Sequence, residues 1–217
     1  MLKTFLFSLL CFVADLPAGV VNAPATTNGP ILVLGDSLSA AHHIAVEAGW
    51  VHLLETRLKT SSSNTSAKPR EVVNASISGE TTAGGLARLP KLLADTKPKL
   101  VIVELGANDG LRGLPLSEIR ANLHKILSAN RDSGARSVLL GIELPINYGP
   151  QYRDGLRTLY RDLAAEFNAP LVPFLLDGVA LDPALMQDDG LHPKAEGEPR
   201  VLENVWKVLE PALEARR

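Results

Sequence analysis

Apolar and polar residues follow two different periods along the chain. Five short apolar runs alternate with longer segments in which apolar residues recur at spacings of three and four. The first pattern predicts buried strands, and the second predicts amphipathic helices. Because the two alternate, we expect a parallel sheet with helices on both faces. The predicted strands are residues 31–34, 72–77, 100–106, 137–142 and 170–176, and the predicted helices are residues 50–59, 84–95, 117–132, 152–168 and 201–215.

The segments between these elements add few signals. Ser117, two residues after Pro115, is a candidate N-cap of the helix that follows. Residues 59–70 are rich in serine and threonine, which suits an exposed loop. No internal repeat or linker interrupts the sequence, and 217 residues are enough for a substantial core. We therefore expect one folded domain.

The first 25 residues have the pattern of a bacterial secretory signal peptide. Lys3 precedes an apolar run over residues 5–14, and small residues follow. Ala23 and Ala25 each end a triplet suited to cleavage, and the proline directly after Ala23 favours cleavage after Ala25. The sequence therefore predicts a leader over residues 1–25 and export to the periplasm.

Charge and cysteine content narrow the classes of partner. Lys and Arg number 22 and Asp and Glu number 24, so the net charge of −2 argues against a nucleic-acid partner. After the leader, no apolar stretch approaches the roughly 20 residues that span a bilayer, so we expect no membrane span in the mature protein. The only cysteine, Cys11, lies inside the leader. The mature domain, residues 26–217, is expected to be a monomer without disulfides.

Residues of catalytic type follow the first predicted strand. Gly35, Asp36 and Ser37 come directly after the apolar run 31–34. One interpretation is structural, because glycine suits a tight turn and serine or aspartate caps a helix. The other is chemical, because open α/β sheets bind ligands at the carboxyl ends of their strands. In either case Asp36 is expected to accept backbone N–H bonds within the turn.

A serine nucleophile needs a base and a group that orients the base. His192 follows Asp189 by three residues, with Gly190 between them, so one short turn can aim both side chains the same way. Taken alone, the two residues are equally well explained as a helix cap and a turn histidine. His52 and His124 lie in predicted helices without an acid in the same turn, so we interpret them as bystanders.

His42 and His43 follow Ser37 and are placed in the first helix, at the entrance of the site. A metal site on these histidines needs further ligands at suitable spacing, and no cysteine or pair of carboxylates lies near them in the sequence. We therefore predict neither a metal nor another cofactor.

Four blocks of the sequence resemble the SGNH branch of the GDSL hydrolases. They are "GDSLS" (35–39), "NASISGET" (74–81), "VELGANDGLRG" (103–113) and "QDDGLHP" (187–193). Together with "LARLPKLL" and "LPINYG", they make the chain similar to the bacterial thioesterase I group, over almost all of residues 30–210. Those periplasmic enzymes hydrolyse acyl thioesters, aryl esters and lysophospholipids. The resemblance implies a flavodoxin-like three-layer α/β/α sandwich with five parallel strands.

The resemblance also implies roles for individual residues. Ser37 is the expected nucleophile, His192 the base and Asp189 its orienter. The expected oxyanion hole consists of the backbone N–H groups of Ser37 and Gly79 and the side-chain amide of Asn108. Taken singly, Gly79 and Asn108 are better explained as turn residues, but two such residues at adjacent strand ends beside the Gly-Asp-Ser turn favour the oxyanion hole.

The expected acyl site is less distinctive. Residues 110–115 match a mobile loop that covers this site in the thioesterase I group. Glu143 stands where we expect an uncharged or basic residue, which argues against a preference for anionic head groups such as that of acyl-CoA. Ordinary packing explains any one of the acyl-site candidates equally well. These candidates are Gly110, Leu111, Leu114, Leu144, Pro145 and Ile146.

The sequence therefore predicts a serine hydrolase of acyl esters and thioesters that works through an acyl-enzyme. A carbohydrate O-acetyl esterase with the same four residues is the alternative within enzymes. A receiver-like signalling domain is the alternative from another class, but it needs clustered acids at the end of the first strand, where only Asp36 is found. A catalytically inactive binding protein is a third alternative, although every residue of the tetrad is present.

Overall fold

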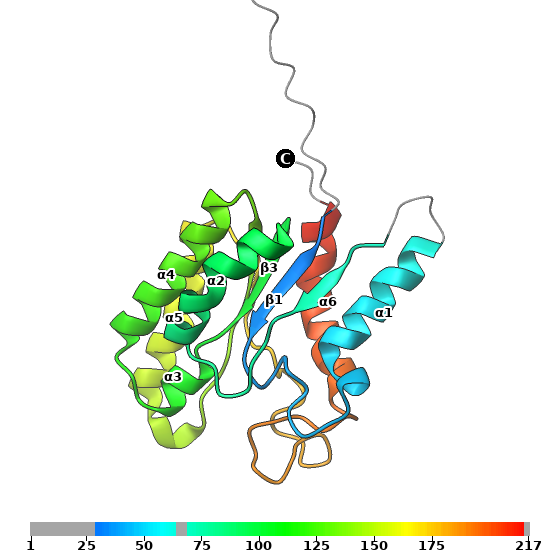
Figure 1. Cartoon of the computed structure of the whole chain (residues 1–217). Helices are drawn as coiled ribbons and strands as arrows, with labels where there is room; N and C mark the ends of the chain where they lie inside the picture. The colour runs from blue at the N-terminus through cyan, green and yellow to red at the C-terminus, as the bar shows by residue number, and fades with distance from the viewer. Residues whose placement is uncertain (1–28, 64–68, 215–217) are drawn as a thin grey trace, which may run out of the picture.

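A five-stranded parallel sheet forms the centre of the structure, a computed structural model that describes residues 29–63 and 69–214 (Figure 1). The strands are β1 (Ile31–Gly35), β2 (Val72–Asn74), β3 (Leu100–Glu104), β4 (Arg136–Leu140) and β5 (Leu171–Val172). The α-helices are α1 (Trp50–Ser63), α2 (Thr82–Thr96), α3 (Ala107–Leu111), α4 (Leu116–Asp132), α5 (Pro150–Glu166) and α6 (Glu198–Glu214). Two 3₁₀ turns are η1 (Val46–Ala48) and η2 (Ile146–Tyr148). The predicted leader and part of the predicted loop 59–70 lie outside the described residues.

In the strand order β2-β1-β3-β4-β5, the first strand of the chain lies inside the sheet, between β2 and β3. The chain moves from β1 to one neighbour, β2, and then crosses back to the other neighbour, β3. Helices α1 and α6 pack together on one face, and α2, α4 and α5 cover the other (Figure 1). The predicted three-layer sandwich is confirmed. In such a sheet, ligands bind where the strand order reverses, at the carboxyl ends of β1 and β3.

The central strands of the sheet form the core, because helices cover both faces of the sheet there. All five residues of β1 and all five of β3 are buried, which is why the first four residues of each form an unbroken apolar run. Their register pairs Ile31 with Leu100 and Gly35 with Glu104, so the two strands end level with each other. Residues that follow β1 and β3 in the chain therefore meet at one edge of the sheet.

Several predicted boundaries were wrong. Strand β5 ends at Val172 instead of residue 176, since Pro173 lacks an N–H for a sheet hydrogen bond. Ser117 is not the N-cap of α4, because that helix begins one residue earlier with Pro115 in the cap position. The histidine pair 42–43 lies in turns ahead of α1, where the left-handed backbone of His43 (φ +58°) interrupts helical geometry.

A short helix that the sequence did not predict, α3, follows β3. Gly106 precedes it with a φ of +122°, a conformation that favours glycine. Helix α3 includes Asn108 and Gly110, so neither is a β-turn residue. Within residues 29–63 and 69–214, no helix is long and apolar enough to cross a membrane.

Glu198 is a buried acid at the start of α6, shortly after His192 in the sequence. Its carboxylate accepts the N–H of Trp50 at 2.8 Å, and the residue is 2% exposed. Burial raises its pKa to about 7, although the hydrogen bond from Trp50 acts in the opposite direction. The folded protein therefore holds a proton on Glu198 at pH values where the unfolded chain has lost it.

We predict that this proton makes the free energy of unfolding fall as the pH rises from 4.5, the ordinary pKa of the group, to about 7. The shift corresponds to a loss of at most about 3 kcal/mol across that window. Urea unfolding at pH 5 and pH 8 measures it. In Glu198→Gln the contribution should vanish, whereas Glu210→Gln, an exposed change on the same helix, should keep the parent's pH dependence.

Candidate active site

Ser37 lies in a tight turn at the carboxyl end of β1. The carboxylate of Asp36 accepts the N–H of Leu38 at 3.0 Å, so Asp36 supports the turn as predicted. Gly35 has no room for a side chain, because an added Cβ would lie 2.8 Å from Ser39 and Ser76. The turn therefore packs against the segment after β2 and holds Ser37 at the edge where β1 and β3 end.

The imidazole of His192 contacts both Ser37 and Asp189. Its Nε2 lies 2.8 Å from Ser37 Oγ, and its Nδ1 lies 2.6 Å from Asp189 Oδ2. The other carboxylate oxygen of Asp189 accepts the N–H groups of Leu191 and His192, a turn that Gly190 makes with a φ of +66°. Burial would raise the pKa of Asp189, but these hydrogen bonds and the imidazole hold it at about 2. Asp189 is therefore a carboxylate at neutral pH.

Gln187 fixes the turn that carries His192, a role that the sequence did not predict. Its side-chain amide donates to the carbonyls of His42 and Pro193 at 2.9 and 2.8 Å. Its backbone N–H donates to the carbonyl of His192 at 2.8 Å. The base is thus tied to the segment that follows the serine. A glutamine two residues before the acid gave no signal in the sequence, since its partners are main-chain carbonyls.

Two buried acids lie beneath the serine turn. Glu104 at the end of β3 is fully buried, and its Oε2 accepts the N–H of Asp36 at 3.0 Å and the hydroxyl of Ser39 at 2.9 Å. The carboxyls of Asp36 and Glu104 influence each other's pKa. Burial raises the pKa of Asp36 to about 6 and raises the pKa of Glu104 well above its ordinary value. Two interacting carboxyls in a dry site do not readily ionise together.

The candidate oxyanion donors surround the serine. Within the described chain, no hydrogen bond uses the backbone N–H of Ser37 or Gly79. Gly79 has a φ of +80° and an open space at its missing Cβ. The amide of Asn108 donates to Asp36 Oδ2 at 3.0 Å and to the carbonyl of Glu80 at 2.9 Å. These contacts fix the Asn108 side chain beside the two free N–H groups.

A cavity of about 280 Å³ opens next to these groups. Ser37, Gly79, Asn108 and His192 lie on one side of it. The rest of its lining is largely apolar. The polar members are His42, Ser78 and Glu143, and the apolar ones are Leu38, Ala107, Leu111, Ile142, Leu144, Pro145, Phe174, Leu175, Leu176 and Leu191. An apolar cavity with a few convergent polar groups is the usual form of a small-molecule site. Here the polar groups are those that acyl transfer requires.

A family model described as "GDSL-like Lipase/Acylhydrolase family" matches residues 33–199, which include the serine turn, the free N–H groups and the Asp189–His192 turn. The chain belongs to this family.

Curated relatives of this GDSL-like hydrolase agree with that assignment. It is 49% identical to "Esterase TesA" of Pseudomonas aeruginosa, over 84% of this chain and 89% of that protein. It is 45% identical to "Arylesterase" of Vibrio mimicus, over 87% and 92% of the two chains. It is 42% identical to "Thioesterase 1/protease 1/lysophospholipase L1" of Escherichia coli, over 83% of each chain.

The solved crystal structure of TesA superposes with a TM-score of 0.80 at 49% identity, covering 84% of this chain and 98% of that one. These similarities confirm the predicted family, the predicted fold and the predicted class of ester hydrolase. The roles of individual site residues stay predictions.

The acyl-site candidates of this GDSL-like hydrolase separate into two groups. Leu111, Leu144 and Pro145 line the cavity, whereas Gly110, Leu114 and Ile146 do not. Gly110 is buried and would contact Leu144 with an added Cβ at 2.9 Å, Leu114 packs against the core, and Ile146 is 83% exposed. The sequence missed the other side of the wall, Phe174–Leu176, because the run 170–176 read as one continuous strand.

Residues 110–115 are held by two tyrosines that the sequence did not single out. Tyr148 donates its hydroxyl to the carbonyl of Leu111 at 2.7 Å, and Tyr152 donates to the carbonyl of Leu114. Both tyrosines come from the segment that includes η2 and the start of α5. The two bonds tie this candidate loop to the elements that follow β4.

The remaining histidines occupy different surroundings. His42 stacks on His43 with ring centroids 3.7 Å apart, and its ring lies 4.4 Å from that of His192. Burial, together with the nearby His192 and His43, lowers the pKa of His42. His124 contacts Glu166, and His52 lies 3.9 Å from Glu55, both away from the cavity. Among the residues the structure describes, no group of three or more potential ligands is arranged to hold a metal ion.

Proposed function

We propose that this chain is a serine hydrolase of medium and long acyl esters and thioesters, including aryl esters, acyl-CoA and lysophospholipids. The observation that carries the proposal is the continuous contact from Asp189 through His192 to Ser37 at the mouth of an apolar cavity. The names of the relatives support the range of head groups. Ser37, His192 and Asp189 then act as nucleophile, base and orienter.

The geometry supports a two-step reaction. Ser37 Oγ attacks the acyl carbonyl carbon while His192 Nε2 takes the hydroxyl proton. The negative oxygen of the tetrahedral intermediate accepts hydrogen bonds from Ser37 N–H, Gly79 N–H and the Asn108 amide. The intermediate then expels the thiolate or alkoxide, which receives the proton from His192. Water repeats the sequence on the acyl-enzyme, so that a carboxylic acid leaves and Ser37 regains its proton.

The apolar wall favours an acyl chain over the alternative of a carbohydrate O-acetyl esterase. Ten apolar residues line the cavity, whereas acetyl offers a single methyl group to fill it. Burial of each methylene contributes about 0.8 kcal/mol. A long acyl chain therefore supplies binding energy to this enzyme. An acetyl group does not supply it to a deacetylase that uses the same four catalytic residues.

A p-nitrophenyl ester series from acetyl to dodecanoyl tests the proposal. We predict that kcat/KM rises by at least about 10-fold from acetyl to octanoyl, since a few buried methylenes account for that factor. The parent should also gain one fluorophosphonate adduct, located on Ser37 by mass spectrometry. Ser37→Ala should lose both turnover and adduct, while Ser133→Ala, remote from the cavity, should keep both.

A steep fall beyond acetyl would support the O-acetyl esterase instead. Labelling of Ser37→Ala as fast as the parent would remove Ser37 as the nucleophile. Turnover of none of the esters by folded parent protein would contradict the proposed function as a whole.

Export to the periplasm and a monomeric state belong to the same proposal. The leader pattern over residues 1–25 supports export, and the site is complete within one chain. N-terminal sequencing of protein recovered from the periplasm distinguishes cleavage after Ala23 from cleavage after Ala25. Sedimentation of the same sample measures the oligomeric state.

A further inference from the structure

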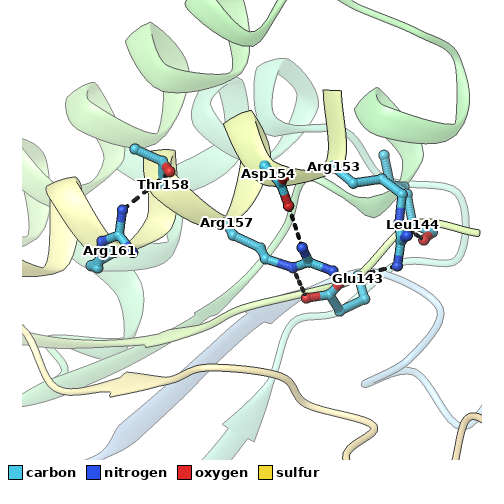
Figure 2. Close-up of polar contacts among 7 residues, drawn as sticks. All are labelled: Glu143, Leu144, Arg153, Asp154, Arg157, Thr158 and Arg161. Atoms are coloured by element: carbon cyan, nitrogen blue, oxygen red, sulfur yellow. Dashed lines mark hydrogen bonds and ion pairs between the residues drawn. The ribbon is translucent and has the colours of Figure 1, made fainter. Parts of the chain in front are cut away.

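A cluster of charged side chains lies at the cavity wall formed by the segment after β4. Glu143 lines the cavity and is the only carboxylate among the described residues that do so. Two arginines of α5 bind it, as Figure 2 shows: Arg157 donates from Nε to Oε1 and from Nη2 to Oε2 (2.6 Å), and Arg153 Nη2 lies 3.4 Å from Oε2. The side chain of Glu143 is 20% exposed, whereas that of Arg157 is 42% exposed, so water reaches the arginine side of the pair.

The contact between Arg157 and Glu143 is a fork in which two nitrogens of one guanidinium face two oxygens of one carboxylate. Phosphate oxygens fit the same fork, which is why arginine recognises both groups. The opposite edge of Arg157 binds Asp154, a side chain that is 65% exposed and does not line the cavity. Glu143 therefore binds the edge of the Arg157 guanidinium that is nearer the cavity.

Arg153 adds a second connection to the same wall. Its Nε donates to the carbonyl of Leu144 at 2.8 Å, next to its contact with Glu143. Glu143 thus binds two guanidiniums directly behind the cavity wall, while Asp154 binds the far edge of Arg157. Without the Glu143 carboxylate, these cationic donors would be left next to the cavity without that partner.

We propose that Glu143 is a specificity-determining residue that occupies an arginine site for anionic head groups and so turns the enzyme toward neutral substrates. The inference rests on the proposed function, since it concerns the head groups of the same acyl substrates. Acyl-CoA and anionic lysophospholipids then compete with Glu143 for Arg157 and Arg153 and meet its negative charge. Neutral aryl esters and thioesters do not.

Two thioesters with one acyl chain isolate this effect. Octanoyl-CoA carries phosphates, and the octanoyl thioester of N-acetylcysteamine has the same bond and chain without charge. The readout is the ratio of kcat/KM for the anionic thioester to that for the neutral one, because changes in acyl binding or in chemistry cancel. A unit charge some 8 Å away changes such a ratio by roughly 3-fold to 30-fold, depending on the local dielectric.

We predict that Glu143→Gln raises the ratio by about 3-fold to 30-fold and that Arg157→Gln lowers it. Matched controls come from further along α5. Arg161→Gln removes the same charge as Arg157→Gln, but Arg161 binds Thr158 and points away from Glu143 (Figure 2). Asp162→Asn removes a negative charge at a side chain that is 50% exposed and outside the cavity. Both controls should keep the parent's ratio, and the effect of Glu143→Gln should shrink as salt is added.

A ratio in Glu143→Gln that stays within twofold of the parent's, or that falls, would overturn the inference. Equal shifts in the two controls would assign the effect to net charge and would overturn it as well. If the parent hydrolyses neither thioester, the proposed function itself is wrong. Turnover of both with an unmoved ratio would reject the role of Glu143 alone.

Discussion

Replacing His192 by alanine is expected to lower kcat by on the order of 10⁵-fold to 10⁶-fold, as removal of a triad base does in other serine hydrolases. Its imidazole is the only one within hydrogen-bond distance of Ser37 Oγ among the described residues, at 2.8 Å. Without it no group takes the serine proton, so Ser37 stays a weak nucleophile. Steady-state turnover of p-nitrophenyl octanoate measures the loss, with circular dichroism to verify folding.

His124→Ala and His52→Ala are the matched controls, because both histidines lie away from the cavity. They should keep kcat within a few-fold of the parent. In the parent, Asp189, with a pKa of about 2, stays ionised at the pH of such assays. Asp189→Asn should reduce activity less than His192→Ala. A loss in His124→Ala equal to that in His192→Ala would show that the base has been assigned to the wrong residue.

Asn108→Ala is expected to lower kcat by on the order of 10²-fold to 10³-fold with little change in KM, because an oxyanion donor acts mainly in the transition state. The structure adds a second effect. The Asn108 amide also donates to Asp36, so its removal takes one hydrogen bond from a buried carboxyl. We therefore expect a lower melting temperature beside the loss of kcat. Active-site titration separates the two, since it counts folded active molecules.

Asn122→Ala is the control for the structural part of this effect. Asn122 donates to the hydroxyl of buried Thr82 at 3.1 Å, but it does not line the cavity. It should lower the melting temperature without lowering kcat per titrated site. If Asn108→Ala behaves in the same way, Asn108 is a structural residue only, and Ser37 and Gly79 remain as the two oxyanion donors.

The sequence predicted the layers of this fold well because β1 and β3 are buried on both faces. Such strands are mostly apolar, and this pattern can be recognised without knowledge of the neighbouring strands. The ends of elements were harder. Strand β5 contains two residues, and the apolar residues Phe174–Leu176 after it leave the sheet and line the cavity. Burial in a binding site and burial in a sheet leave the same apolar pattern in a sequence.

The sequence predicted the site residues whose chemistry allows only a few residue types. It did not predict the supporting residues, whose role depends on where the fold places them. Ser37, Asp189 and His192 stand in short motifs, and the structure brings them into contact. Glu104 was not foreseen, although an acid at the end of an apolar strand is a signal for a buried polar contact. Gln187 binds main-chain carbonyls, which carry no sequence signal. The arginine partners of Glu143 lie in the next helix of the chain, α5. Only the folded arrangement reveals such pairs.

The contact between Ser37 and His192 joins residues 155 positions apart, with the base on the last loop before α6. On a ribosome, which makes the chain from its N-terminus, every strand of the sheet is synthesised before the histidine. A nascent chain that stops between residues 38 and 191 thus has its serine but no histidine base beside it. Under the proposed function, we expect translation products that stop before residue 192 to be inert toward acyl esters in the cell.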